Sequence, residues 1–572
     1  MKPIERLQYP DPNIIRKKTQ IINDGWLFSF DGVSWREIRV PFCPESKLSG
    51  IGHTDFIEQC FYQKKIDLHK TDERVIIHFG AVDYRCILYV NGGYVGSHVG
   101  GYTPFSFDIT DVCSEGENIL YLQVFDHEQR VCPSGKQSYK KQSFGCFYSR
   151  TTGIWQNVWL EFVPRIRLVQ LHFSPSAQKQ SVQVDLSANG CADCCIEIFY
   201  EDRLVGLFRG EISYHANVEI DLREKFLWES GCGRLYDVVV TFGEDLVFSY
   251  FGLRDVCYRG YEFLLNGKPV FQKLVLDQGY YPDGIYTAPG CEAMQKDIRL
   301  ALDLGFNGAR LHQKVFDPRF LYLCDVNGYM VWGEYASWGV DFSSLRFFGR
   351  FLQEWEETLS RDFNHPSIVT WCPLNETWGT WEDAREKRDV RFVDLLYDFT
   401  KVYDPTRPCV DVSGGHHGHK TDLFDFHCYA DAPQLWEYLN KLDREDALDV
   451  PLLYGDGECL RYQKGVPVNL SEFGGVRFTS KQDENIVAAV NDGMVESEGP
   501  WGYGKGELNA DAFLDRYEML VQAAFSCRKL SGFCYTQLYD VEQEENGLYR
   551  YDRTDKFTEE QKARIRRINF CR

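Results

Sequence analysis

The second half of the chain alternates between short apolar runs and longer stretches with helical spacing. The apolar runs have the length of buried strands, and amphipathic stretches follow most of them. The runs are 273–276, 308–311, 329–332, 368–371, 409–412, 425–428, 468–470 and 532–535, and the helical stretches are 291–304, 317–327, 344–362, 390–403 and 512–529. Eight such units between residues 257 and 572 predict a (β/α)8 barrel, in which the chemistry lies at the carboxyl ends of the strands.

The first half of the chain is expected to contain only strands. Residues 1–163 show alternating runs such as 75–79 and 119–124, separated by turn sequences such as Asn91-Gly92-Gly93. Pro164 ends this pattern, and residues 164–256 repeat it on a smaller scale, with runs such as 236–240. We therefore predict a β-sandwich over 1–163, an immunoglobulin-like β-sandwich over 164–256 and the barrel over 257–572.

Charge and hydropathy exclude two classes of partner. The formal net charge is −21 at pH 7, and such an acidic surface repels the phosphate backbone of nucleic acids. No apolar run reaches the roughly 18 residues that a membrane-spanning helix needs. We expect neither nucleic-acid nor membrane binding.

The 20 cysteines are spread along the predicted strands and helices, and the first residues, MKPIERLQYP, contain no apolar signal-peptide core. This pattern predicts reduced thiols and a cytoplasmic protein. The cluster Cys191, Cys194 and Cys195 has no second set of ligands at zinc spacing. Three histidines within 416–419 are more often exposed or substrate-facing than metal-binding, so no metal and no other cofactor is expected.

Polar residues follow several predicted barrel strands. They are Arg310 and His312, Glu334, Asn375 and Glu376, His427 and Tyr429, Ser471 and Glu472, and Asp540 and Glu542. Strands four and seven lie on opposite sides of the barrel mouth, so Glu376 and Glu472 can face each other across a sugar. Such a pair serves glycoside hydrolysis, with retention at a carboxyl separation of about 5–5.5 Å and inversion at about 6.5–9.5 Å. The competing interpretation is that these glutamates are surface charges.

The sequence around both glutamates resembles glycoside hydrolase family 2, the family of β-galactosidases, β-glucuronidases and β-mannosidases. Asn364-His365-Pro366-Ser367-Ile368, Trp371 and Asn375-Glu376 resemble its acid/base signature, and Ser471-Glu472-Phe473-Gly474-Gly475 resembles its nucleophile segment. Gly153–Leu160 resembles the end of the family's sugar-binding jelly roll, Gly252-Leu253-Arg254 the entry to its barrel, and Leu265–Pro269 the opening hairpin. The resemblance covers all three predicted domains and implies a jelly roll for the first.

The resemblance implies a role for individual residues. Glu376 corresponds to the general acid/base and Glu472 to the nucleophile, and Asn375 to the group that bonds the sugar 2-hydroxyl. Tyr429 corresponds to a tyrosine beside the nucleophile. Arg310 is expected to form a structural ion pair. The remaining residues expected to contact substrate are His312, His427, Asp277, Gln278, Trp378 and Tyr535, while Trp381 and Trp378 stack on the sugar or anchor their loop.

Several positions depart from the family pattern and bear on the identity of the sugar. Thr377 replaces the usual proline after the acid/base, Tyr535 a tryptophan, and Asp277-Gln278 the usual Asn-X-His. The Asn-X-Lys pair with which β-glucuronidases bind a carboxylate is absent from 546–550, although Arg550 or Lys505 offers another cation.

We therefore predict a retaining exo-β-glycosidase that acts on a β-galactoside-like terminal sugar of a small carbohydrate or glycoconjugate. A uronidase of the same family, for glucuronides or galacturonides, is the alternative enzyme. An inactive carbohydrate-binding protein on the same scaffold is the alternative outside the enzymes. Because relatives are often dimers or tetramers, a homo-oligomer is expected.

Overall fold

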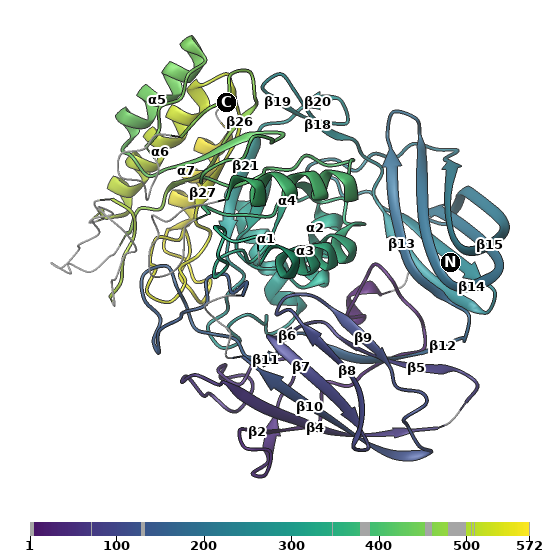
Figure 1. Ribbon diagram of the computed structural model, residues 1–572. Helices are drawn as coiled ribbons and strands as arrows, with labels where there is room; N and C mark the ends of the chain where they lie inside the picture. Colours follow the sequence, from purple (N-terminus) through teal and green to yellow (C-terminus); the bar gives the residue numbers. More distant parts are fainter. Residues whose placement is uncertain are drawn as a thin grey trace.

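The computed structural model describes residues 5–69, 71–126, 132–345, 347–377, 389–451, 460–478, 499–504, 506–507 and 509–570. They form two β-sandwich domains and a curled parallel sheet surrounded by helices, as predicted (Figure 1). None of the described cysteines forms a disulfide. Among the helices in these ranges, none is both long and apolar enough to cross a membrane.

The jelly roll, at the bottom of Figure 1, follows a short 3-10 helix at Arg6–Gln8. Its main sheets have the strand orders β1-β12-β5-β9 and β3-β2-β4-β10-β7-β8, and β6 pairs with β11. Apolar residues alternate along these strands and pack between the sheets. The strands are β1 Thr19–Ile21, β2 Trp26–Ser29, β3 Arg36–Ile38, β4 Gln59–Leu68, β5 Arg74–Phe79, β6 Val82–Asp83, β7 Arg85–Val90, β8 Gly93–Val99, β9 Phe105–Asp108, β10 Gly116–Phe125, β11 Gly153–Ile154 and β12 Val158–Val163.

The second domain, to the right in Figure 1, is built on two long strands. A register shift between Ser187 and Cys191 divides β14 into a half that pairs with β13 and a half that pairs with β16, and β15 pairs with both halves. Its strands are β13 Leu168–Ser176, β14 Ser181–Tyr200, β15 Arg203–Asp221, β16 Tyr236–Phe242 and β17 Asp245–Phe251. The N-terminal segment packs here: Ile15 bridges to Phe248 and Arg16 pairs with Asp245.

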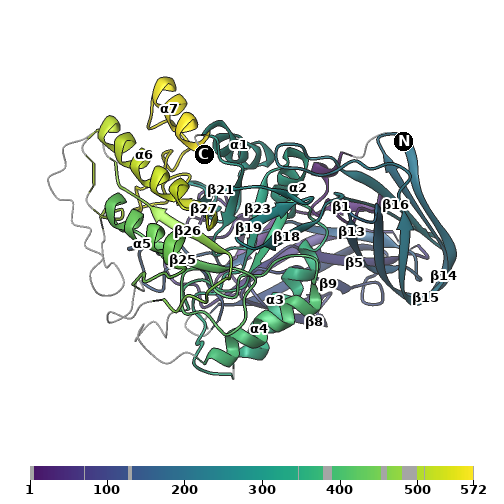
Figure 2. The same cartoon turned by 90° about the horizontal axis from the view of Figure 1, so that it is seen from above.

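The barrel sheet has the order β24-β23-β22-β21-β27-β26-β25, with all its ladders parallel. Figure 2 shows helices α5 and α6 on the side away from the second sandwich. A hairpin of β18 Val256–Arg259, β19 Glu262–Leu265 and β20 Lys268–Pro269 precedes the sheet. The strands are β21 Gln272–Asp277, β22 Gly308–Leu311, β23 Met330–Glu334, β24 Ile368–Cys372, β25 Phe424–Cys428, β26 Val468–Gly474 and β27 Leu530–Thr536. The helices are α1 Cys291–Asp303, α2 Pro318–Asn327, α3 Phe348–Asp362, α4 Val390–Tyr403, α5 Ala432–Glu445, α6 Ala510–Ser526 and α7 Glu559–Phe570.

The fifth predicted strand, 409–412, does not form a continuous ladder. It touches the β24 side of the barrel through two isolated parallel bridges, Trp371 to Cys409 and Asn375 to Ser413. The Asp411 carboxylate accepts from His417 and from the Gly418 amide, so this segment is tied into the following loop. It still delivers Ser413 to the barrel mouth.

The barrel interior is apolar at one end and polar at the other. Leu274, Leu276, Trp332 and Cys534 point inward and pack with hairpin residues that close the amino-terminal end. Because side chains alternate along a strand, the next inward positions toward the carboxyl ends hold polar groups. The fold therefore collects these groups at one mouth.

A loop of the jelly-roll domain, residues 132–150, covers part of this mouth. The Ser134 amide donates to Trp338 O over 2.8 Å, and the Trp501 indole donates to Gly145 O over 2.6 Å. Phe144 and Phe147 of the loop pack with both tryptophans. The first domain thus contributes a wall to the barrel mouth.

Candidate active site

The two predicted catalytic glutamates lie together at the carboxyl ends of β24 and β26. Glu376 is 7% exposed and Glu472 4%, and oxygens of the two carboxyl groups lie within 4.8 Å of each other. That distance is close to the separation in retaining glycosidases and well below that in inverting ones. The pair can therefore flank one glycosidic bond.

Glu472 is surrounded by groups that stabilise its negative charge. Arg310 Nη1 donates to its Oε1 over 2.8 Å, and the Tyr429 hydroxyl donates to its Oε2 over 2.6 Å. Burial alone would raise the pKa of Glu472. Electrostatic attraction to the neighbouring His427 and Arg310 outweighs burial and holds that pKa well below its usual range. Glu472 is thus ionised at neutral pH, as a nucleophile must be.

His427, predicted to contact substrate, lies between the two glutamates. Its Nδ1 is 2.8 Å from Glu376 Oε1 and 3.4 Å from Glu472 Oε2. Its Nε2 lies 3.3 Å from Arg310 Nη1, which can only donate, so the neutral ring carries its proton on Nδ1. That N–H then donates to Glu376 and fixes the position of its carboxyl group.

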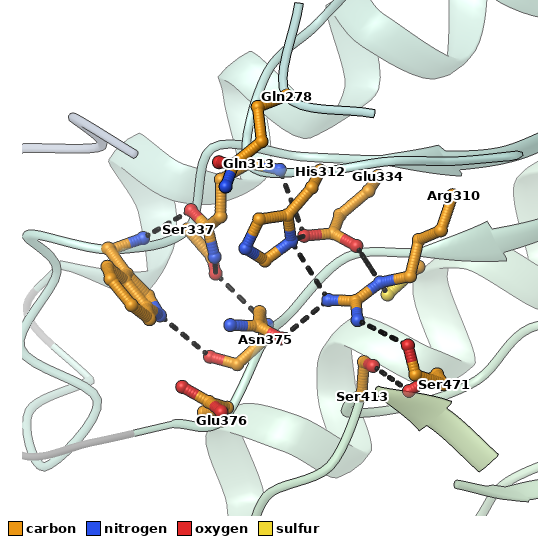
Figure 3. A network of polar contacts seen from close by, with 12 residues as sticks. Gln278, Arg310, His312, Gln313, Glu334, Ser337, Asn375, Glu376, Ser413 and Ser471 are labelled. Atoms are coloured by element: carbon orange, nitrogen blue, oxygen red, sulfur yellow. Dashed lines mark hydrogen bonds and ion pairs between the residues drawn. The ribbon is translucent and has the colours of Figure 1, made fainter. Parts of the chain in front are cut away.

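Arg310 connects Glu472 to the neighbouring strands. Figure 3 shows its contacts with Glu334 and Asn375. Its Nε donates to Glu334 Oε2 over 2.5 Å, and its Nη2 donates to Asn375 Oδ1 over 2.6 Å. Burial would raise the pKa of Glu334, but the Arg310 charge lowers it to about 2. The structural ion pair expected of Arg310 is present, and the same guanidinium also binds Glu472, a contact that was not predicted from the sequence.

His312 belongs to the same network. Its Nδ1 lies 2.9 Å from Glu334 Oε1, and burial lowers the pKa of His312 to about 4, so the ring is neutral at physiological pH. No hydrogen bond joins its Nε2 to any residue in the described ranges. A neutral ring with this open nitrogen suits a contact with a sugar hydroxyl.

Two buried polar atoms at the mouth have no partner among the described residues: Asn375 Nδ2 and Gln278 Oε1. The Asn375 carbonyl is held by Arg310, so its amide nitrogen is the open donor. The Gln278 amide nitrogen donates to Tyr148 and Gln537, each over 2.8 Å, which leaves its carbonyl open. Buried polar groups without partners are rare because they cost free energy, and substrate hydroxyls are their natural partners.

The backbone around Glu376 is held in an uncommon conformation. Glu376 has φ 55° and Thr377 φ 37°, both in the left-handed region. The Glu376 amide donates to Ser413 O over 2.8 Å, and a Cβ on Gly415 would lie 2.5 Å from the Glu376 carbonyl carbon. Glycine at 415 therefore lets the loop after the fifth strand pass close enough to support this strained backbone.

Two predicted substrate contacts point away from the mouth. The Tyr535 ring packs against Phe473 and against Tyr517 of α6. Asp277 accepts hydrogen bonds from the Gly279 amide and the Tyr539 hydroxyl. Both side chains lie on the outer face of the sheet because their neighbours along the strands point inward. Trp378, Trp381 and Lys505 lie outside the described residues.

Other segments bring to the mouth polar and aromatic groups that were not predicted from the sequence. The main ones are Lys136, Tyr148, Ser337, Trp338, Thr536, Gln537 and Glu544. Strand alternation could have identified Thr536, two positions after Cys534. Strand alternation could not have identified Lys136 and Tyr148, because both belong to the jelly-roll domain and not to a barrel strand.

Glu376, His427 and Glu472 are the one group in the described ranges whose ligand atoms lie close enough to surround a cation. All three are already joined to one another or to Arg310 and Tyr429 by hydrogen bonds. The predicted histidine loop offers no such cluster, since His417 binds Asp411 and His419 binds Asp394. These hydrogen bonds suit a group that donates and accepts protons.

Comparison with known proteins identifies the family. Residues 54–164 match the model of the sugar-binding domain of glycosyl hydrolases family 2, and residues 259–454 match that of the family's TIM barrel domain. The chain belongs to glycoside hydrolase family 2. The predicted resemblance is confirmed.

Individual family 2 relatives are distant in sequence. A β-galactosidase of Thermoanaerobacter pseudethanolicus is 26% identical over 64% of this chain and 52% of its own length. A β-glucuronidase of Streptococcus agalactiae is 25% identical over 56% of this chain and 59% of its own length. The chain thus spans little more than half of these curated relatives. The crystal structure of a family 2 β-galacturonidase from Eisenbergiella tayi bound to galacturonate has a TM-score of 0.75 at 20% identity, covering 97% of this chain and 98% of the other.

Proposed function

We propose that this protein is a retaining exo-β-glycosidase that uses Glu376 as general acid/base and Glu472 as nucleophile. The observation that carries the proposal is the pair of buried carboxyl groups whose oxygens lie within 4.8 Å, one of them held ionised by Arg310 and Tyr429. A retaining mechanism needs one protonated and one ionised carboxyl group on opposite sides of the anomeric carbon.

In the first step, protonated Glu376 gives its proton to the glycosidic oxygen while a Glu472 oxygen attacks the anomeric carbon. The bond to the aglycone breaks and a glycosyl–enzyme ester forms. The ester removes the charge of Glu472, so Arg310 and Tyr429 also stabilise the group that leaves in the second step. A water molecule then gives a proton to Glu376, attacks the anomeric carbon and releases the sugar with retained configuration.

Asn375 is the residue in position to assist the transition state. Its open Nδ2 donor suits the sugar 2-hydroxyl, while Arg310 holds the other end of the amide. Hydrogen bonds to that hydroxyl strengthen as positive charge develops on the sugar ring. Asn375 therefore contributes to rate rather than only to affinity.

For the sugar itself, we favour a β-linked uronic acid over the β-galactoside that the sequence alone favours. A β-glucuronidase and a β-galactosidase are both among the relatives, and a structural neighbour is a β-galacturonidase bound to galacturonate. Arg550, the cation that the sequence offers for a uronate, is exposed and donates to Asp555 O. The carboxylate therefore needs another partner.

A panel of chromogenic β-glycosides tests the proposal: glucuronide, galacturonide, galactoside, mannoside and arabinopyranoside, each with wild type and Glu472→Gln. We expect hydrolysis of a uronide by wild type and a loss of at least about 1,000-fold in the variant. Nuclear magnetic resonance of the first product follows the anomeric configuration. An inverted first product, or undiminished turnover by Glu472→Gln, would contradict the mechanism.

The competing function is carbohydrate binding on an inactive scaffold. The ionised Glu472 and the nearby Glu376 argue against it, because a binding protein has no need for a charge stabilised at this site. Binding of sugars with no turnover across the whole panel would support that function instead.

A further inference from the structure

The loop 132–150 of the jelly-roll domain carries a lysine into the barrel mouth. Gly135, with φ 57°, precedes it, and a Cβ at this position would lie 2.4 Å from Gln313 O of the barrel. The Lys136 carbonyl accepts from the Tyr148 amide over 2.8 Å. Both ends of the loop therefore fix the Lys136 backbone against the catalytic domain.

The Lys136 ammonium is buried and has an aromatic neighbour but no acceptor. The residue is 6% exposed, and its Nζ lies 4.2 Å from the centre of the Trp338 ring. No hydrogen bond or ion pair joins Nζ to any residue that the structure describes. Burial would lower the pKa of Lys136, but nearby Cys146, Glu544 and Glu472 raise it above its ordinary value. The side chain is thus a charged donor with three open N–H groups.

Among the carboxylates, Glu544 raises the pKa of Lys136 most, but its oxygens have other hydrogen-bond partners. It accepts hydrogen bonds from the Tyr148 hydroxyl and, over 2.9 Å, from Asn546 Nδ2. Burial raises the pKa of Glu544. Lys136 is therefore attracted toward this side of the mouth without being bound there.

Two other buried cations that the structure describes around the site, Arg310 and Lys314, already have acceptors. Arg310 uses its nitrogens on Glu334, Glu472 and Asn375. Lys314 donates to the Gly279 and Tyr286 carbonyl groups, and burial lowers its pKa to about 7. Among these buried cations of the described barrel mouth, Lys136 alone has its donors open.

We propose that Lys136 binds the carboxylate of the terminal uronic acid, so that the jelly-roll domain selects the sugar hydrolysed in the barrel. This inference rests on the proposed function and names the residue that selects its class of substrate. Trp338 holds the ammonium against the site: its own indole nitrogen donates to Asn375 O over 3.3 Å, next to the open Asn375 amide. A carboxylate supplies the acceptors that the buried ammonium lacks, and a charged pair of this kind is strong where water is excluded.

The test compares wild type with Lys136→Met, which keeps the length of the side chain and removes its charge. Lys141→Met is the matched control, because Lys141 lies on the same loop but is exposed and pairs with Asp55. For each protein, kcat/KM is measured on nitrophenyl β-glucuronide and β-galacturonide and on the corresponding neutral glucoside and galactoside. Thermal unfolding of each variant shows whether it is folded.

In Lys136→Met we expect kcat/KM on the uronide to fall by about 100-fold or more, with a change of less than about 3-fold on the neutral sugar. Lys141→Met should leave both unchanged. An equal fall on both sugars, or an unchanged ratio of uronide to neutral sugar, would overturn the role of Lys136 while leaving the glycosidase mechanism intact.

Calorimetric binding of free glucuronate and galacturonate keeps the test independent of turnover. Wild type should bind one uronate more tightly than the corresponding neutral sugar, and Lys136→Met should lose that difference. If wild type binds no uronate, or hydrolyses only neutral glycosides, the inference is wrong. If no glycoside at all is cleaved but the uronate preference depends on Lys136, the binding site stands and the proposed catalysis fails.

Discussion

The hydroxyl of Tyr429 donates to Glu472 Oε2 over 2.6 Å, on the carboxylate oxygen that Arg310 does not bind. Each carboxylate oxygen of Glu472 thus has its own donor. The Tyr429 ring is stacked on Tyr503 with centroids 3.4 Å apart, so its hydroxyl is held in place by packing. The ionised state of Glu472 therefore depends on two separate contacts, and one of them can be removed with little disturbance.

We predict that Tyr429→Phe lowers kcat by roughly 10- to 100-fold and moves the acid limb of the pH–activity profile to higher pH. Glu472 must be ionised to attack, and its pKa is held well below the usual value. Loss of a donor to the charged form raises that pKa, so activity begins to fall at a higher pH. Tyr397→Phe is the control. Tyr397 lies on α4, and its hydroxyl donates to Asp422 over 3.0 Å. An unshifted acid limb in Tyr429→Phe would show that the hydroxyl does not control ionisation.

Asn375 is predicted to act on the sugar 2-hydroxyl. In Asn375→Ala, kcat/KM on an ordinary substrate should fall by about 100-fold because the bond strengthened in the transition state is lost. A 2-deoxy analogue of the same substrate lacks the partner, so the substitution should change its hydrolysis far less. This double comparison separates the hydroxyl contact from any displacement of Arg310, which also binds Asn375. Equal losses on both substrates would assign Asn375 a purely structural role.

Much of this architecture follows from local pattern. The recurring strand–helix pairs predict the barrel, and the strand ends predict Glu376, Glu472, His427 and Tyr429 at its mouth. To predict the direction of a side chain, one must also know which alternate residues of the strand point into the barrel. Cys534 and Thr536 point inward, so Tyr535 between them packs outside against α6.

Other features could not be read from the sequence in the same way. Lys136 is remote from every barrel strand, and only the packing of one domain on another brings it over Trp338. The apolar residues of 409–412 predict a fifth strand. They do not indicate that Asp411 accepts hydrogen bonds from His417 and the Gly418 amide in the following loop. Contacts between distant segments depend on the completed fold.

The backbone conformation at residue 377 explains why threonine stands where the family usually has proline. Its φ of 37° is incompatible with proline, whose φ is close to −65°, and its amide donates to Asn375 O over 2.6 Å. Thr377→Pro, which restores the usual family residue, should therefore destabilise the loop by about 2–3 kcal/mol and displace Glu376. Thr377→Gly tolerates positive φ and keeps the amide, so it should remain close to wild type. Thermal unfolding and kcat measure both effects, and a fully active, equally stable Thr377→Pro would refute this account.

Glu354 links the catalytic barrel to the jelly roll through a buried carboxyl group. Its oxygens accept from the Tyr84 hydroxyl over 2.8 Å and the Tyr335 hydroxyl over 2.6 Å, and the side chain is 0% exposed. Burial raises the pKa of Glu354 to about 7 from an ordinary value of 4.5. The folded protein therefore binds a proton at this site that the unfolded chain releases above pH 4.5.

The sign of the pH dependence follows from this difference. The contribution of Glu354 to stability is fully present below about pH 4.5 and is lost as the pH rises through about 7, a change of about 3 kcal/mol. Glu354→Gln stays neutral at every pH. The unfolding temperature of Glu354→Gln minus that of wild type should therefore increase between pH 5 and about pH 8. Glu356→Gln, an exposed position on the same helix, removes the same charge and should show no such trend. A constant difference between Glu354→Gln and wild type across this range would mean that Glu354 is already ionised in the folded protein.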